Sequence, residues 1–205
     1  MIESALKAIQ GRQANIMGHE GAFKSAVAVP LIMEDGALKV LFEKRAATLS
    51  AQPGEISFPG GKIEPFETPQ AAALRETCEE LGLVREDLEM VGPLDVLLTP
   101  FGLIIYPFVC QIQETADIKP NPAEVETAFT VPLSYLMQVR PIKKMVSMKM
   151  ALPPDYPYEL IPNGKDYPWR EGYYPQYFYQ YQDWVIWGLT ARILHHFLHL
   201  VKQDG

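Results

Sequence analysis

The chain has few cysteines, no long hydrophobic run and no recognisable targeting segment. Its two cysteines in 205 residues, Cys78 and Cys110, are too few for a disulfide framework. Both lie in apolar patterns, which favours thiols buried in a core. No stretch reaches the ~18 uninterrupted apolar residues of a membrane span. Residues 1–12 lack a signal-peptide core, and the C-terminal residues carry no Ser-Lys-Leu peroxisomal address. These absences predict a cytoplasmic protein with no membrane partner.

The chain also lacks an excess of basic residues. Lys and Arg number 18 against 25 Asp and Glu, which gives a formal net charge of −7. Attraction to nucleic acid is therefore not expected, and an anionic phosphate substrate would need a metal ion to bind against this charge. We predict one domain over residues 1–205, with an N-terminal helical extension at 1–20 and a Pro-rich loop at 152–172. The sequence leaves open whether the protein forms a homodimer.

Apolar periodicity predicts strands interspersed with helices. The predicted strands are 24–33 and 38–42, paired as a hairpin, then 55–58, 88–98, 103–112, 124–131, 143–151 and 173–181. Helices are predicted at 2–10, 69–81, 132–138 and 184–201. We expect the first helix to pack on the core through one face, which carries Ile2, Ala5, Leu6 and Ile9. This order of elements indicates strands between helices, an α/β/α arrangement.

The helix expected at residues 69–81 has clear ends and two different faces. Thr68 and Pro69 suit its start, and Gly82 suits its end. At about 100° per residue one face is apolar, and we expect it to contact the core; it carries Ala71, Leu74, Cys78 and Leu81. The other face carries carboxylates at i, i+3 and i+4, namely Glu76, Glu79 and Glu80.

These carboxylates must be neutralised by something, because like charges at this spacing repel. A fourth, Glu67, precedes the helix. Arg75 lies one turn from Glu79 and can brace part of the group, but one Arg cannot balance four Glu. An acidic face exposed to solvent is the ordinary interpretation. The alternative is a hard divalent cation held by oxygen ligands.

The spacing of residues 61–83 favours the cation. Gly61 is followed after five residues by Glu67, after seven by Arg75-Glu76, after two by Glu79-Glu80 and after one by Gly82-Leu83. This pattern resembles the Nudix box of the Nudix hydrolases, with Thr77 where the family usually has a larger aliphatic residue. The resemblance implies the Nudix fold, an α/β/α sandwich of α+β class with a mixed sheet.

The resemblance also implies an enzyme that hydrolyses nucleoside diphosphates linked to another moiety. In that family the positions of Glu76, Glu79 and Glu80 are ligands of Mg²⁺ or Mn²⁺, with Glu67 joined through a water. The Gly60 carbonyl is a further candidate ligand, since glycine permits close backbone approach. A water would attack a pyrophosphate phosphorus, and charge stabilisation would supply most of the acceleration.

Residues before the box resemble the coenzyme A pyrophosphatase subgroup of this family. Residues 41–62 read LFEKRAATLSAQPGEISFPGGK, and the matching positions are Arg45, Leu49, Gly54, Phe58, Pro59, Gly60 and Gly61. Residues 98–103, 121–125 and 186–194 resemble other segments of the subgroup. Ser50 and Gln52 depart from it, because the subgroup usually has Arg and His there. The implied substrate is coenzyme A or acyl-coenzyme A.

Several side chains are candidates for binding and proton transfer. Arg45 is expected to clamp a substrate phosphate, beside Gly60 and Gly61. The base that activates water is Glu79, Glu80 or Glu124, with Arg75 supporting the catalytic glutamates. For Glu124 the other interpretation is a surface residue at a strand end.

Other interpretations remain open. ADP-ribose or a dinucleotide is an alternative substrate, and a ligand-sensing domain without turnover is an alternative of another class. Trp184 and Trp187 are interpreted as core residues. The aromatic residues at 173–179 are assigned to the core rather than to adenine stacking; they are Tyr173, Tyr174, Tyr177, Phe178 and Tyr179. The histidines near the C-terminus are assigned to an amphipathic helix rather than to a metal site; they are His195, His196 and His199.

Overall fold

A long hairpin forms the centre of the main sheet. The computed structural model describes residues 2–12, 16–18 and 21–203. Strands β1 (Phe23–Glu34) and β2 (Ala37–Arg45) pair antiparallel across a turn at Asp35 and Gly36, both of which have positive φ. On its other side β1 pairs in parallel with β7 (Leu103–Ile112) over ten residues. The sheet is therefore mixed, as predicted.

Five shorter strands complete this sheet. They are β3 (Ile56–Ser57), β4 (Gly60–Lys62), β5 (Leu88–Pro93), β6 (Leu97–Leu98) and β8 (Val125–Pro132). The order is β3-β2-β1-β7-β5, with β4 on β1, β6 on β7 and β8 on β2. The segment predicted as one strand over 88–98 is thus two strands, because the pairing of β5 with β7 shifts register between Met90 and Gly92 and residues 94–96 lie outside both.

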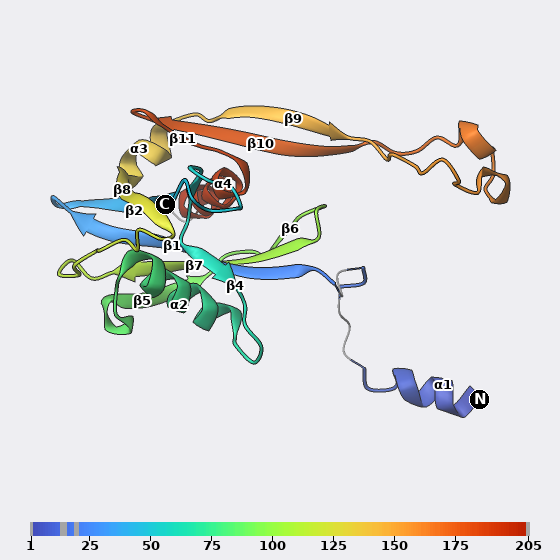
Figure 1. Cartoon of the computed structure of the whole chain (residues 1–205), viewed down its shortest axis with the longest axis horizontal. Helices are drawn as coiled ribbons and strands as arrows, with labels where there is room; N and C mark the ends of the chain where they lie inside the picture. Colours follow the sequence, from blue (N-terminus) through green and yellow to red (C-terminus); the bar gives the residue numbers. More distant parts are fainter. Residues whose placement is uncertain (1, 13–15, 19–20, 204–205) are drawn as a thin grey trace.

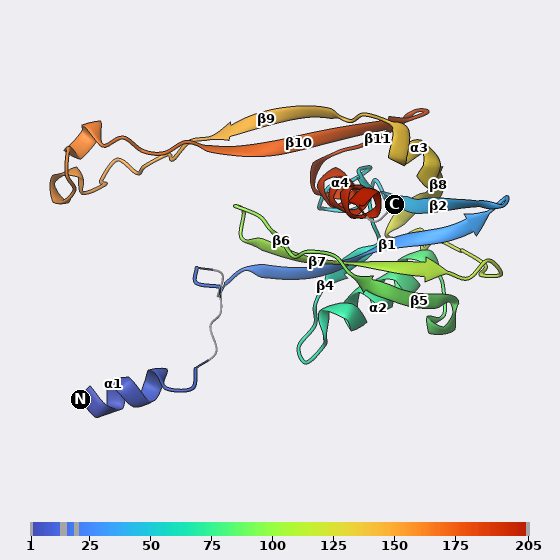
Figure 2. The ribbon, with the colours of Figure 1, turned by 180° about the vertical axis from the view of Figure 1, so that it is seen from behind.

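Helices cover both faces of this sheet (Figures 1 and 2). Helix α2 (Pro69–Leu81) lies on one face, where Leu74 and Leu81 pack with Leu41 and Cys110. Helix α4 (Gly188–Gln203) lies on the other, where Leu194 and other apolar residues pack with Val29, Val40 and Phe42. Neighbouring residues of one strand, such as Leu41 and Phe42, serve opposite faces because side chains alternate along a strand. The predicted α/β/α arrangement is confirmed.

A three-stranded arm extends from the body (Figure 1). After α3 (Leu133–Gln138), strand β9 (Ile142–Met148) pairs with β10 (Gly172–Tyr181), which pairs with β11 (Trp184–Ile186). Residues 149–171 contain the Pro-rich stretch and lie at the far end of the arm; they hold the short 3₁₀ helices η2 (Tyr158–Leu160) and η3 (Gly164–Asp166). A third 3₁₀ helix, η1 (Arg85–Asp87), follows α2.

Two predictions about helices were partly wrong. Helix α1 (Ile2–Ile9) forms, but Ile2, Leu6 and Ile9 are exposed, because the helix lies away from the sheet and meets none of the core (Figure 2). The side chain of Ala5 is outside the described part. The last helix starts at Gly188 rather than at position 184, since Trp184–Ile186 pair with β10 as a strand.

The buried cysteine agrees with its predicted core role. Cys110 is fully buried, and burial raises the pKa of its thiol to about 12. Cys78 is half-buried, and burial raises its thiol pKa as well. Thiols with raised pKa values form few thiolates at neutral pH and are inert. Among the described helices none is long and apolar enough to cross a membrane.

Gly82 should be a determinant of stability, because it ends α2 in a left-handed conformation. Its φ is 66°, and a Cβ there would lie 2.2 Å from the Lys119 carbonyl oxygen. We expect Gly82→Ala to lower the free energy of unfolding by about 1–3 kcal/mol, the scale of left-handed strain in a non-glycine residue. Gly92→Ala is the matched control, since Gly92 has open space around it. Equal denaturant midpoints for the two variants would contradict this account.

Candidate active site

Helix α2 buries part of its acidic side against the sheet together with apolar residues. Ala72 and Ala73 pack against Ala26 of β1, and such small side chains let the helix backbone approach closely. Leu74 and Leu81 contact the core as expected, but Glu80 is buried beside them and Ala71 is exposed, so the buried face is rotated from the one expected from periodicity. Periodicity gives the angle between faces, but not which faces meet the sheet.

Thr77, which departs from the Nudix pattern, is fully buried on this helix. Its hydroxyl donates a hydrogen bond of 2.6 Å to the Ala73 carbonyl oxygen in the preceding turn. The bond satisfies the polar atom inside the core. The substitution therefore leaves the carboxylates on the same face of α2 and changes only the packing beneath them.

Strand β4 brings two glycines against the helix carboxylates. A Cβ on Gly61 would lie 2.4 Å from the Glu76 carboxyl carbon, and one on Gly60 would lie 2.3 Å from the Ala26 carbonyl oxygen. The Gly60 amide donates a 2.7 Å hydrogen bond to Glu80 Oε2. Only glycine leaves room for this backbone between β1 and the carboxylates, and close backbone approach was the expectation for Gly60.

Arg75 binds three of the predicted carboxylates. Its guanidinium donates to Glu67 at 2.9 and 3.1 Å, to Glu76 at 2.8 Å and to Glu79 at 3.0 Å, and it also donates to the Lys62 carbonyl oxygen at 3.1 Å. Hydrogen bonds from Arg75 hold the pKa of Glu67 below its usual range. Arg75 therefore braces the outer half of the acidic group, as its spacing indicates.

Glu43 of β2 is an acidic residue that sequence reasoning missed. It is 1% exposed, Ser57 Oγ donates to its Oε1 at 3.0 Å, and its Oε2 has no partner among the described residues. Burial raises the pKa of Glu43, the Arg45 charge opposes this, and the charges of Glu124 and Glu76 add to it. The sequence signal that could have identified Glu43 is its position directly after the apolar residues of the strand predicted at 38–42.

Glu80 and Glu124 lie in the same electrostatic environment as Glu43. Burial raises the pKa of Glu80, and the charges of Glu43, Glu76 and Glu124 raise it further against the Gly60 hydrogen bond. The loop before β8 reaches this point because the Asn121 amide donates to the Glu80 carbonyl oxygen at 2.8 Å. The Asn121 side-chain amide donates to Glu124 at 3.2 Å.

Together these four side chains, Glu43, Glu76, Glu80 and Glu124, form what we call the carboxylate cluster. Burial also raises the pKa of Glu76. Within the described ranges no three carboxylate, histidine or cysteine side chains lie in the arrangement of a metal site. Arg75 donates a hydrogen bond to Glu76, and the Gly60 amide donates one to Glu80. The cluster's chemistry nevertheless fits a hard divalent cation. It supplies only oxygen donors, one of them is buried without a partner, and among the described residues only Glu76 of the four carboxylates pairs with a cation, Arg75.

A cavity of about 570 Å³ lies beside this cluster. The three predicted substrate-binding residues, Arg45, Gly60 and Gly61, all line it, and so does Gln52. Arg45 Nε also donates to the Ala51 carbonyl oxygen at 3.4 Å, which shapes the loop at the cavity edge. A pyrophosphate group would fit in this recess. The Arg45 guanidinium lies at one wall, and the backbone of β4, which adjoins Glu76 and Glu80, forms another.

Comparison with known proteins decides the family. Residues 22–148, more than half of the chain, match the NUDIX domain. The chain belongs to the Nudix family. It is 30% identical over 183 residues to Nudix hydrolase 3 of Caenorhabditis elegans, covering 87% of this chain and 73% of that protein. It is 31% identical over 179 residues to the Nudix hydrolase NudL of Photorhabdus laumondii, covering 87% and 84%.

Another relative carries a more specific name. Over 120 residues the chain is 37% identical to the peroxisomal coenzyme A diphosphatase NUDT7 of Mus musculus, a match that covers 58% of this chain and 51% of that protein. The predicted Nudix membership, fold and enzyme class are confirmed. This Nudix hydrolase is a pyrophosphohydrolase, and Nudix hydrolases generally use divalent metal ions.

Aromatic and histidine residues near the C-terminus follow the predictions in part. His195 stacks on Tyr177 and pairs with the Tyr179 hydroxyl, while His196 contacts Asp95. Tyr174, Tyr177 and Tyr179 are buried as predicted, but Tyr173 is exposed. Trp187 was wrongly assigned to the core: it follows β11, is 39% exposed and lines the cavity beside the cluster.

Metal removal should make stability strongly pH-dependent. The raised pKa values of Glu43, Glu76 and Glu80 mean that the folded protein holds protons which the unfolded chain has lost. Stability without metal should therefore fall as pH rises above the ordinary Glu value of about 4.3. Since Mg²⁺ would bind the ionised cluster, we expect the increase in melting temperature on adding Mg²⁺ to grow from pH 6 to pH 8.

Thermal unfolding in Mg²⁺ and in chelator measures this effect. Glu80→Gln should lose most of the Mg²⁺-dependent increase, whereas Glu89→Gln, an exposed residue of β5, should keep it. A melting temperature at pH 8 that does not respond to Mg²⁺ would refute the assignment of a metal to the cluster.

Proposed function

We propose that this Nudix hydrolase cleaves the pyrophosphate of coenzyme A or acyl-coenzyme A to 3′,5′-ADP and (acyl-)4′-phosphopantetheine. The observation that carries the proposal is the carboxylate cluster beside a cavity lined by Arg45 and the Gly60–Gly61 backbone. The subgroup pattern in residues 41–62 and the coenzyme A diphosphatase name of the mouse relative support the substrate. The reaction would occur within one domain over residues 1–205.

The cluster and its neighbours would hold Mg²⁺ or Mn²⁺. We assign as ligands Glu76, Glu80, Glu79 and the Gly60 carbonyl, with Glu67 acting through a water. For this, Glu76 and Glu79 must exchange their hydrogen bonds to Arg75 for the ion, and Arg75 would keep Glu67. When bound, the ion neutralises the phosphoryl oxygens and lowers the pKa of the attacking water.

The protein's own residues supply positioning and proton transfer. Arg45 would bind a phosphate oxygen across the cavity with its forked donors. Glu124 would take the proton of the water that attacks phosphorus, with its carboxylate oriented by Asn121. Glu79 is a weaker choice of base because Arg75 holds it on the outer side of the helix. Glu80 is engaged by the Gly60 amide.

Other substrates and classes remain as outcomes of the test. ADP-ribose or a dinucleotide would suit the same chemistry, and Ser50 and Gln52 lack the cationic groups usual in the coenzyme A subgroup. A sensor without turnover has no need for four intact box carboxylates. A cytoplasmic location stays our prediction; the mouse relative is named as peroxisomal.

Replacement of the proposed base gives one test. Glu124→Gln keeps the size of the side chain but cannot accept the proton, so we expect kcat to fall by about 10²-fold or more. The acidic limb of the pH–rate profile should flatten, while the Mg²⁺ concentration for half-maximal activity should change little. Glu126→Gln, two residues along β8, is the matched control, because Glu126 pairs with Lys44 at the surface. An unchanged rate and profile for Glu124→Gln would return the role to Glu79 or Glu80.

A substrate comparison tests the function itself. Turnover of coenzyme A, 3′-dephospho-coenzyme A, ADP-ribose, NADH and diadenosine polyphosphates should be measured with Mg²⁺ and Mn²⁺. We expect coenzyme A to be hydrolysed with only modest preference over its 3′-dephospho form, because Ser50 supplies no cation. Ser50→Arg should raise that preference by about ten- to a hundredfold in kcat/KM, the scale of one charged contact. Turnover of ADP-ribose with none of either coenzyme would refute the coenzyme A assignment.

A further inference from the structure

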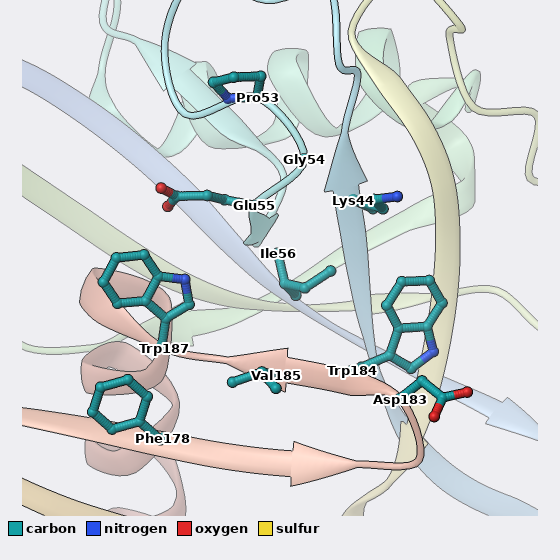
Figure 3. Close-up of a pocket in the computed structure, with 10 residues that line it drawn as sticks. All are labelled: Lys44, Pro53, Gly54, Glu55, Ile56, Phe178, Asp183, Trp184, Val185 and Trp187. Atoms are coloured by element: carbon teal, nitrogen blue, oxygen red, sulfur yellow. The ribbon is translucent and has the colours of Figure 1, made fainter.

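Trp187 is a large aromatic residue that the proposed chemistry does not use. It lies between β11 and α4, and 39% of its surface is exposed. Its indole stacks nearly parallel to Phe178, with centroids 6.2 Å apart and an interplanar angle of 6°. Figure 3 shows Trp187 between Phe178 and the segment Pro53–Glu55. The Phe178 ring supports the indole in one orientation while part of its surface stays open.

The position of Trp187 links two cavities. It lines the 570 Å³ cavity that also contains Arg45, Gly60 and Gly61. It also lines a neighbouring cavity of about 630 Å³, together with Trp184 and Glu55 (Figure 3). A ligand whose pyrophosphate lies against Gly60 and Gly61 can therefore extend toward Trp187 without leaving the recess.

We propose that Trp187 stacks on the nucleobase of the substrate and so determines its preference for nucleoside derivatives. The inference rests on the proposed function, which supplies a pyrophosphate bonded to a nucleoside. In coenzyme A the adenine is the only aromatic group, and flat bases stack on exposed aromatic rings. The pantetheine arm has no ring to stack. Trp187 is thus a specificity-determining residue.

Phe101 is the aromatic rival within the same cavity. It is 72% exposed and meets Tyr174 edge-on, with ring centroids 6.2 Å apart and an interplanar angle of 66°. Phe101 is therefore more exposed than Trp187, and less of its ring is held by neighbouring residues. Trp187 has the larger π surface and packs beside a nearly parallel ring, so it offers the more preorganised platform.

Binding of two small probes tests the proposal independently of turnover. AMP and ribose 5-phosphate share the phosphorylated sugar, but only AMP has a base. Calorimetric titration with Mg²⁺ present should show that Trp187→Leu lowers the affinity for AMP by about tenfold, the scale of one lost base stack. The affinity for ribose 5-phosphate should not change. Trp187→Phe should retain part of the preference. With coenzyme A, Trp187→Leu should raise KM and leave kcat nearly unchanged.

Two controls sharpen the outcome. Trp184→Phe should bind both probes as the wild type does. Trp184 stacks on Phe129 with centroids 4.4 Å apart, and it lines the 630 Å³ cavity but not the 570 Å³ cavity beside the carboxylate cluster. An unchanged ratio of AMP to ribose 5-phosphate affinity in Trp187→Leu, or loss of that ratio in Phe101→Leu instead, would overturn the proposal. If coenzyme A is turned over without this dependence, the inference fails and the function stands. If AMP binding depends on Trp187 but neither coenzyme is hydrolysed, the function fails and the inference stands.

Discussion

The burial of carboxylates against the β4 backbone is the constraint on which the rest of the site depends. Glu43 and Glu80 are almost completely buried, burial raises the pKa of both, and the charge of Glu43 raises the pKa of Glu80 further. Two ionised carboxylates in a medium of low dielectric constant are unstable without a counter-charge. The small side chains of α2 and the glycines of β4 create this burial by letting backbones approach. The fold therefore maintains a site that favours a divalent cation through its own electrostatic imbalance.

Arg75 explains how the protein tolerates this imbalance. Its guanidinium donates several hydrogen bonds to the outer carboxylates. In the described chain the side chains of the inner carboxylates have one hydrogen-bond donor each: Ser57 for Glu43 and the Gly60 amide for Glu80. The outer carboxylates are thus partly neutralised by a fixed cation, whereas no Lys or Arg of the described chain pairs with Glu43 or Glu80. This division accounts for a single Arg serving an acidic group that it cannot balance alone.

The sequence predicted the features that depend on neighbouring residues and missed those that depend on long-range contacts. The spacing of residues 61–83 was sufficient for the family, and Thr68 and Gly82 for the ends of α2, because caps and spacing are local properties. Glu43 was missed since its proximity to Glu80 arises from the placement of β2 beneath α2, a long-range feature. Trp187 was misassigned because i, i+3 spacing suggested a helix face, whereas β11 pairs with β10 and the helix starts one residue later.

The residues that would serve chemistry and substrate binding come from two parts of the chain. The carboxylate cluster falls within residues 22–148, which match the NUDIX domain. Part of the cavity wall, from Trp187 to Ile193, lies beyond that range, at the link between the arm and α4. Residues Gly188 to Ile193 of this wall belong to α4, which lies on the opposite face of the sheet from α2 and its glutamates. Under the two proposals above, substrate preference would therefore depend on this wall together with Arg45 and Ser50, while the buried glutamates keep their positions.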